Sequence, residues 1–244
     1  MIKRFIDAIV ELIGLTVIFG FAYLIISGDS LELLERSVTR LAPGIHGTQP
    51  LVMKGGDPYI RALMRTITAS EANDSRPYNV IYGGKHVQDL SKHPNLCVPI
   101  VRGPNVGKCT TAAGRYQFLN STWYDKALRY HPRPIGFWRW QAYSFEAQYQ
   151  DAVVYAWLND SSAWGVNLGQ MLRKGQIKQV LRRLSGTWTS LGYGIETNSM
   201  SRHLPTIYEK MLREELGQTR GLQQKLMQSN LVVGEASFES NQSE

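Results

Sequence analysis

Residues 57–71 read DPYIRALMRTITASE, and this stretch decides the fold. Asp57 offers an N-cap oxygen, and Pro58 fits the first helical position, where its missing N–H costs nothing. Apolar side chains then recur at helical spacing, at Tyr59, Ile60, Leu63, Met64 and Ile67. The pattern predicts a helix that begins at Pro58 and presents one apolar face to a core.

Glu71 stands at the end of that apolar face, four residues after Ile67 and eight after Leu63. A carboxyl group there is partly buried and lies at the negative end of the helix dipole, so both effects favour its protonated form. Cleavage of a glycosidic bond requires such a general acid. The alternative interpretation is a solvated glutamate at a helix end, because buried glutamate is rare.

The segment after Glu71 predicts a small hairpin. Residues 78–82 (YNVIY) favour an extended strand, Gly83 and Gly84 can take the positive φ angles of a tight turn, and residues 85–87 can pair back. Further helices are expected over residues 116–130, 145–158, 176–188 and 200–216. Helices with one hairpin indicate an α+β domain that is mainly helical, over residues 58–216.

Two flanking segments differ from this domain in composition. Residues 28–57 are rich in glycine and proline, which predicts a linker. Residues 217–244 are polar, with few large apolar side chains, and are expected to form a flexible tail.

The amino terminus resembles a signal anchor. A cationic start at Lys3 and Arg4 precedes an apolar stretch over residues 5–27 that Asp7 and Glu11 interrupt. A helix that spans a bilayer needs about 20 residues, and the basic start favours an amino terminus in the cytoplasm. We expect residues 1–27 to form one transmembrane helix that places the domain on the outer, periplasmic side of the cytoplasmic membrane. A cleaved signal peptide and a buried helix of a soluble protein remain alternatives.

The charge of the chain is concentrated in the expected domain. The net charge is +7, and residues 58–216 contain 20 Lys/Arg and 11 Asp/Glu. A basic domain suits an anionic polymer such as nucleic acid, acidic lipid or cell wall, although it can also serve solubility alone. No nucleic-acid-binding motif is present, so a nucleic-acid partner is not expected. The sequence does not indicate an oligomeric state.

Cysteine and histidine spacing argues against a metal or redox site. Cys97 and Cys109 are twelve positions apart, which fits neither a redox pair nor a zinc ligand set, and the five His show no ligand spacing. We therefore expect no metal and no cofactor. If the domain is exported, the two cysteines should form a disulfide.

Several segments, in order, resemble the endolysins of lambda-type phages, which are lysozyme-fold lytic transglycosylases. They are residues 68–74 (TASEAND), 78–84 (YNVIYGG), 111–119 (TAAGRYQFL) with Trp123, 150–153 (QDAV) and 188–194 (WTSLGYG). The family has a similar "S-E-G", in which the glutamate is catalytic, and a similar "T-G-A-G-R-Y-Q-L-L". Separate motifs that match in order over roughly residues 65–200 are more specific than one short pattern.

The resemblance implies a two-lobed, lysozyme-like domain whose partner is the glycan strand of peptidoglycan. Glu71 would be the catalytic acid for the β-1,4 bond between N-acetylmuramic acid and N-acetylglucosamine, and Tyr116 and Gln117 would lie near the groove. The other candidate substrate-binding residues are Tyr82, Asp89 and Tyr193.

The type of reaction depends on a second carboxylate. A hydrolytic lysozyme usually needs one as nucleophile or base, and Asp74 and Asp89 are the nearest candidates. Both also fit ordinary turn or cap positions. This weak signal favours a lytic transglycosylase, which uses the sugar's own 6-hydroxyl. A hydrolase and a non-catalytic wall-binding module remain alternatives.

The sequence departs from the family in three places. They are the amino-terminal segment, an insert over residues 97–109, and an aromatic insert over residues 132–143 that contains Trp138 and Trp140. These two tryptophans could stack on sugars or could cover the core. The inserts leave glycan-chain specificity open.

Overall fold

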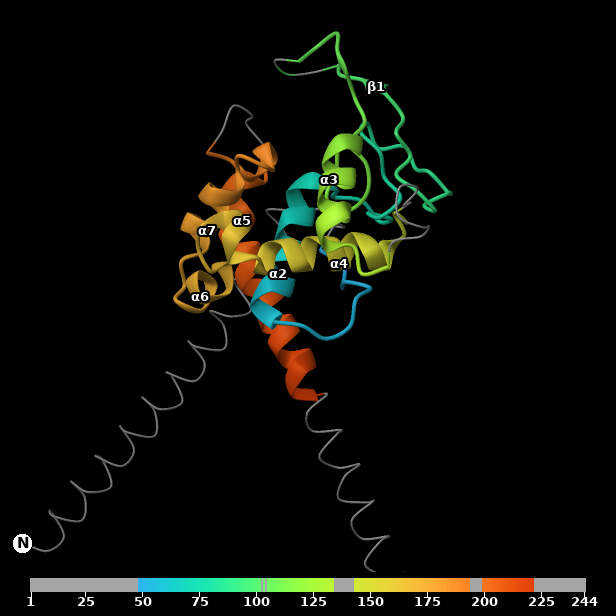
Figure 1. Ribbon diagram of the computed structural model, residues 1–244. Helices are drawn as coiled ribbons and strands as arrows, with labels where there is room; N and C mark the ends of the chain where they lie inside the picture. Colours follow the sequence, from blue (N-terminus) through green and yellow to red (C-terminus); the bar gives the residue numbers. More distant parts are fainter. Residues whose placement is uncertain (1–47, 102, 104, 134–142, 194–198, 222–244) are drawn as a thin grey trace, which may run out of the picture. The chain divides into compact units, whose positions relative to one another are not determined.

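A computed structural model of the chain describes residues 48–101, 103, 105–133, 143–193 and 199–221 (Figure 1). The expected transmembrane helix over residues 1–27, most of the expected linker, Trp138 and Trp140, and residues 222–244 lie outside this description. Within the described residues, no helix has the length and apolar character to cross a membrane.

Helix α2 (Pro58–Glu71) confirms the helix expected from the opening stretch. The Asp57 carboxylate accepts the Tyr59 N–H at 2.9 Å, and Pro58 occupies the first turn. The helix is buried on every side over residues 60–69, whereas the sequence predicted only one buried face. The extra burial is possible because the two arginines of this helix are paired with buried acceptors.

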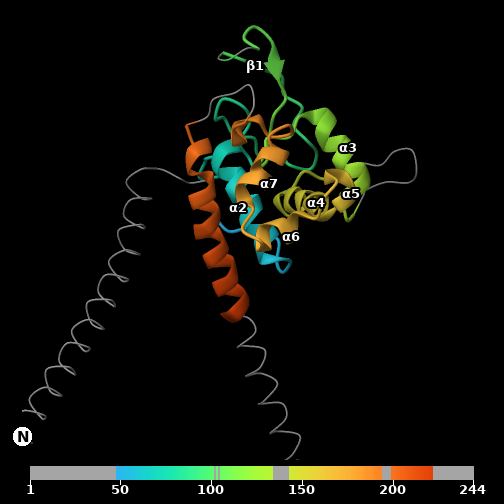
Figure 2. The same ribbon diagram turned by 90° about the vertical axis from the view of Figure 1, so that its left-hand side faces the viewer.

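The other helices surround α2. They are α3 (Asn120–Tyr130), α4 (Ala147–Asn159), α5 (Ser161–Trp164), α6 (Leu168–Arg173), α7 (Ile177–Leu184) and a helix over residues 204–221 (Figures 1 and 2). Two 3₁₀ turns, η1 (Thr189–Leu191) and η2 (Ser201–His203), lie between α7 and the last helix. The four helices predicted after the hairpin are all present, whereas the sequence pattern missed the short α5 and α6.

The boundaries of two predicted helices are corrected. Helix α3 begins at Asn120 rather than at residue 116, because Ala113 pairs with Phe118 and Gln117 has a φ of 46° between them. Helix α7 ends at Leu184, two residues before Gly186, and not at residue 188. In both cases buried apolar residues of the adjoining loop, before α3 and after α7, continue the helical spacing.

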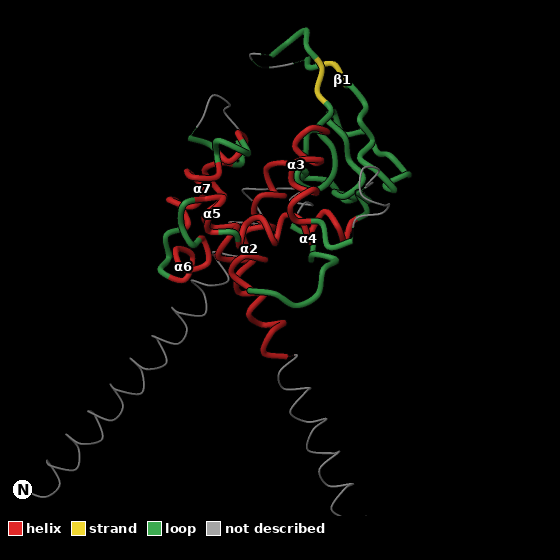
Figure 3. The backbone as a smooth tube through the Cα atoms, in the orientation of Figure 1, coloured by secondary structure: helices red, strands yellow, loops and turns green. Residues whose placement is uncertain are grey.

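The two-stranded sheet lies in the insert and not in the predicted hairpin (Figure 3). Strand β1 (Val98–Pro99) pairs antiparallel with β2 (Cys109–Thr110). The predicted hairpin is reduced to one bridge between Val80 and His86, closed by Gly83 and Gly84 at φ of 84° and 83°. The neighbouring Ile81 instead bridges to Ala113.

A disulfide joins Cys97 to Cys109 beside this sheet, with a Cα–Cα distance of 5.3 Å. This confirms the pairing expected for an exported domain. Since the sheet has only two residue pairs, the covalent bond is the main constraint at the base of this hairpin.

A buried polar network ties the segment before α2 to the core. The Arg115 guanidinium is fully buried and donates to the backbone carbonyls of Gln49 and Pro50 and to the Tyr78 hydroxyl. Tyr78 in turn donates to the Asp151 carboxylate at 2.8 Å. Burying these charges is tolerated because each of them is hydrogen-bonded.

The same network corrects the extent of the expected linker. The Asp151 carboxylate also accepts the N–H groups of Val52 and Met53, and Leu51 is buried. Residues 48–57 therefore pack on the domain although they form no helix or strand. Their glycines and prolines do not prevent packing, because side chains from other elements satisfy their backbone polar groups.

The last helix, over residues 204–221, packs against α2 through an ionic cluster. The buried Glu215 carboxylate pairs with Arg61 and with Arg65, whose guanidinium also reaches Glu214. Helical structure extends beyond the position at which the tail was expected to begin, because residues 217–221 are still helical.

Candidate active site

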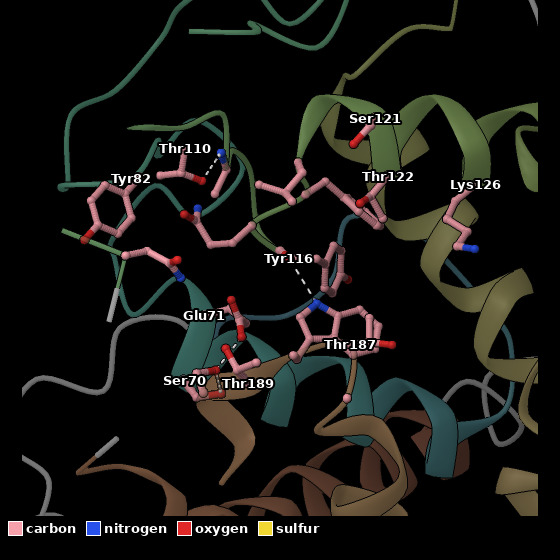
Figure 4. Close-up of a pocket in the computed structure, with 18 of the residues that line it drawn as sticks. Ser70, Glu71, Tyr82, Thr110, Tyr116, Ser121, Thr122, Lys126, Thr187 and Thr189 are labelled. Carbon is pink, nitrogen blue, oxygen red and sulfur yellow. Dashed lines mark hydrogen bonds between the residues drawn. The ribbon is translucent and has the colours of Figure 1, made fainter. Parts of the chain in front are cut away.

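An open groove of about 1230 Å³ runs past the carboxyl end of α2. Its walls come from the end of α2, the disulfide-closed hairpin, helix α3, and the segment that leads into η1 together with η1 itself (Figure 4). Hydroxyl groups dominate the polar part of the lining: Ser70, Thr110, Ser121, Thr122, Thr187, Thr189 and Ser190. A groove rich in hydroxyl groups can exchange hydrogen bonds with a polyhydroxylated ligand.

Glu71 is the last residue of α2, and its half-buried side chain lines the groove. The Ser190 hydroxyl donates a hydrogen bond to the Glu71 carboxylate and lies 3.0 Å from the Ser70 hydroxyl. Ser190 is itself held in place, because the Ser201 hydroxyl donates to its backbone carbonyl at 3.0 Å. The Ser190 hydroxyl thus orients the Glu71 carboxyl group, which Figure 4 shows among the side chains that line the groove.

Tyr116 lies beneath the groove as part of its floor. Its side chain is fully buried, and its phenol donates to the Asp151 carboxylate at 2.7 Å. Burial, together with the nearby negative charge of Asp151, holds the pKa of Tyr116 well above its ordinary value. Tyr116 therefore shapes the groove, and its hydroxyl is already used inside the protein.

Gln117 and Tyr82 line the groove with half-buried side chains. The Gln117 amide nitrogen donates to the carbonyls of Gly114 and Val80, at 2.9 and 3.3 Å. Its amide oxygen is thereby turned away from these carbonyls and can accept a hydrogen bond from a ligand.

The Gly114 position explains why a glycine precedes this arginine–tyrosine–glutamine run. Its φ is 73°, and a Cβ there would lie 2.3 Å from the Gln150 side-chain oxygen. That oxygen accepts the Arg115 N–H at 2.9 Å, so a side chain at position 114 would break the support of the groove floor.

Two other candidates from the sequence do not line the groove. Asp89 is exposed and accepts the Ser91 N–H at 2.8 Å, and hydrogen bonding to the side chain and then the backbone of Ser91 lowers the pKa of Asp89. Tyr193 is 52% exposed, and the Arg182 guanidinium lies 5.1 Å from its ring centre. Asp89 and Tyr193, which the sequence had grouped with Glu71, are therefore not part of the described groove lining.

Asp74, the nearest candidate for a second carboxylate, also lies outside the groove lining. It accepts the Arg76 N–H at 2.6 Å and contacts the His86 ring at 2.7 Å. Burial acts to raise the pKa of Asp74, but these hydrogen bonds outweigh it and lower the pKa. Asp74 is a turn residue that fastens the hairpin to the end of α2.

The structure adds groove residues that sequence reasoning missed. Ser190 was inside the matched 188–194 segment, but nothing in the pattern marked it as a partner of Glu71. The sequence pattern singled out neither Asp125 nor Lys126, yet both line the groove from α3. Their position one turn after Ser121 and Thr122 is the signal that could have grouped them.

No group of three metal-ligating side chains occurs among the residues that the structure describes. The groove's described lining contains two carboxylates, Glu71 and Asp125. Asp125 is mostly exposed and lies 2.6 Å from the Lys126 ammonium. The chemistry available next to Glu71 is therefore that of one carboxyl group surrounded by hydroxyls.

Comparison with known proteins gives one family. The model of the Endolysin family matches residues 61–214. The Endolysin of Escherichia phage lambda is 33% identical over 120 residues, which cover 48% of this chain and 64% of that protein. The match thus spans slightly less than two thirds of the length of this relative.

Two solved structures are also similar. Phage lambda lysozyme complexed with a chitohexasaccharide has a TM-score of 0.49 at 26% identity, covering 65% of this chain and 97% of the other. Lysozyme from bacteriophage lambda has a TM-score of 0.47 at 24% identity, covering 67% of this chain and 97% of the other.

Proposed function

This chain belongs to the endolysin family, and we propose that it cleaves the β-1,4 bond between N-acetylmuramic acid and N-acetylglucosamine in peptidoglycan. The observation that carries this proposal is the position of Glu71, half-buried at the end of α2 in a groove lined with hydroxyls. The negative end of a helix favours the protonated form of a carboxyl group, which is the form that a general acid needs before it protonates a leaving oxygen.

We further propose that the reaction is that of a lytic transglycosylase. Glu71 protonates the glycosidic oxygen while the bond from that oxygen to C1 of muramic acid breaks. The Glu71 carboxylate then takes the proton of the muramic acid 6-hydroxyl as this oxygen bonds to C1. Glu71 ends protonated, no water is consumed, and the product carries a 1,6-anhydro ring. The 6-hydroxyl belongs to the same sugar, so its effective concentration is high.

Ser190 suits a carboxyl group that must be an acid and then a base. A hydroxyl can donate to the carboxylate and can also accept from the carboxylic acid, so it can accompany both states. The contact of Ser190 with Ser70 gives its proton an alternative acceptor when Glu71 is protonated. Ser190 is therefore a positioning residue in this proposal.

The second candidate is hydrolysis with Asp125 as the additional carboxylate. Asp125 favours it because it lines the same groove. Its exposure and its pairing with Lys126 argue against it, since a nucleophile or base near the reacting carbon is normally held in a defined position.

Product analysis of purified peptidoglycan tests both schemes. Glu71→Gln keeps the shape of the side chain but removes the acid, so lytic activity should fall by about 10²- to 10⁴-fold. Asp125→Asn is the matched variant, and it should retain most of the activity. Mass spectrometry of the wild-type products should find 1,6-anhydromuramic acid and no reducing ends.

Other outcomes would redirect the assignment. Reducing-end muramic acid, together with an inactive Asp125→Asn variant, would establish the hydrolase. Full lysis by Glu71→Gln would remove Glu71 from the chemistry. A wild-type protein that binds wall but never releases fragments would be a non-catalytic binding module.

We also propose that residues 1–27 hold the protein in the cytoplasmic membrane, with the groove on the outer side. The disulfide between Cys97 and Cys109 supports this location, because disulfides persist mainly in oxidising compartments.

A further inference from the structure

Lys126 is the one lysine or arginine among the described residues that line the groove. It lies on α3 with Ser121 and Thr122, and Figure 4 shows these three side chains along one helix, away from Glu71. The other two charged residues in the same described lining, Glu71 and Asp125, are both acidic. Without Lys126, this lining would repel an anionic ligand.

The Lys126 ammonium has a defined position. It lies 4.6 Å from the centre of the Trp157 ring, a distance at which a cation is attracted to an aromatic face. Trp157 is only 5% exposed and packs against the rings of Trp164 and Trp188 at 5.0 and 5.3 Å. The charge is therefore held over a rigid aromatic surface at the groove wall.

The present partner of Lys126 can be exchanged at little cost. Asp125 lies 2.6 Å from the ammonium, but its side chain is 69% exposed. An ion pair of this kind contributes little free energy, because water competes for both charges. A carboxylate brought in by a ligand can therefore replace Asp125 or share the ammonium with it.

We propose that Lys126 is a specificity-determining subsite for a carboxylate carried by the lactyl arm of muramic acid. It would favour peptidoglycan strands over neutral polymers of N-acetylglucosamine. The inference rests on the proposed function, since it assigns the substrate of the same groove. The carboxylate has two possible sources, namely the lactyl group itself in strands without peptides and the stem peptide in intact strands.

The test measures binding in the Glu71→Gln background, so that strands stay intact. The three probes are chitohexaose, glycan strands freed of peptides by an amidase, and peptide-bearing strands. Adding Lys126→Met should weaken binding of the anionic probes about fivefold, the effect of one partly exposed charged contact. Binding of chitohexaose should not change, and Lys126→Arg should restore binding of the anionic probes.

Lys178→Met is the matched control, because Lys178 is exposed on α7 and is not part of the described groove lining. Raising the salt concentration should reduce the difference in affinity for the anionic probes between proteins with Lys126 and with Lys126→Met, since salt screens the contact. Peptide-bearing strands affected alone would identify the stem peptide as the source, and peptide-free strands affected alone would identify the lactyl carboxylate. An effect on both anionic probes would show that the subsite accepts a carboxylate from either source.

Two results would overturn the subsite. One is equal weakening of all three probes, which would mean that Lys126 only supports the groove through Trp157. The other is unchanged binding of every probe. The failure of the proposed function is distinguishable, because a wild-type protein that does not cleave could still show Lys126-dependent binding of anionic strands.

Discussion

At the scale of single residues, the site depends on a short chain of hydroxyls around one carboxyl group. Glu71 contacts Ser190, and Ser190 contacts Ser70, which donates to the Ile67 carbonyl at 3.1 Å. A carboxyl group held by a hydroxyl has fewer orientations to lose when substrate arrives, so Ser190 should affect the rate of the reaction more than substrate binding.

Ser190→Ala tests this role. Loss of a hydrogen bond to a charged group is worth about 1.5–3 kcal/mol, so kcat should fall roughly ten- to a hundredfold with little change in KM. Ser190→Thr keeps the hydroxyl and should recover most of kcat. Steady-state kinetics on soluble glycan strands gives both constants. An equal fall for the alanine and threonine variants would show that only packing at position 190 matters.

At the scale of elements, the hairpin of β1 and β2 forms one groove wall with very little sheet. Two residue pairs cannot hold a hairpin in water, so the Cys97–Cys109 bond has to supply most of the constraint. The hairpin supplies Ile100, Gly103 and Asn105 to the groove lining, so its order matters for the site.

The combined Cys97→Ser and Cys109→Ser variant should be less stable by about 3 kcal/mol, the value for closing a loop of this size in the chain-entropy model. Urea denaturation with and without reductant measures this loss of stability, and reductant should affect only the wild type.

Full-length protein should fractionate with membranes and show no free thiol after unfolding. Two titratable thiols, or protein wholly in the cytoplasm, would contradict the proposed location.

At the scale of the whole described domain, a buried ionic cluster joins α2 to the helix over residues 204–221. Glu215 is 2% exposed and is shared by Arg61 and Arg65. The arginines also donate to the carbonyls of Met53 and Thr48, which brings the segment before α2 into the same cluster. Removing one partner of a buried pair leaves an uncompensated charge.

Glu215→Gln should therefore destabilise the domain by about 3–5 kcal/mol. Glu209→Gln on the same helix is the control, because Glu209 is exposed and its loss should change stability by less than about 0.5 kcal/mol. Urea denaturation measures the stability of both variants: the midpoint should shift while the slope of the unfolding free energy against urea concentration stays unchanged. If the two variants unfold at the same urea concentration, the cluster contributes specificity of packing rather than stability.

Local signals in the sequence determined the first helix and the position of Glu71 at its end. The Asp57–Pro58 cap, the apolar spacing and the end of the helix at Glu71 depend on neighbouring residues, and the structure confirms all of them. The two cysteines were also recognisable as a pair. The ordered motifs pointed to the family, which the family comparison confirms.

Tertiary structure decided which distant residues meet at the groove. Ser190 lies 119 residues from Glu71, and no periodicity relates them. Asp89 and Tyr193 belonged to the same stretch of similarity, yet neither lines the groove: Asp89 bonds to Ser91 in a turn, and Tyr193 lies against Arg182. Helix spacing identifies a buried face but not the element that covers it, so Lys126 and the packed residues 48–57 became visible only when long-range contacts placed them.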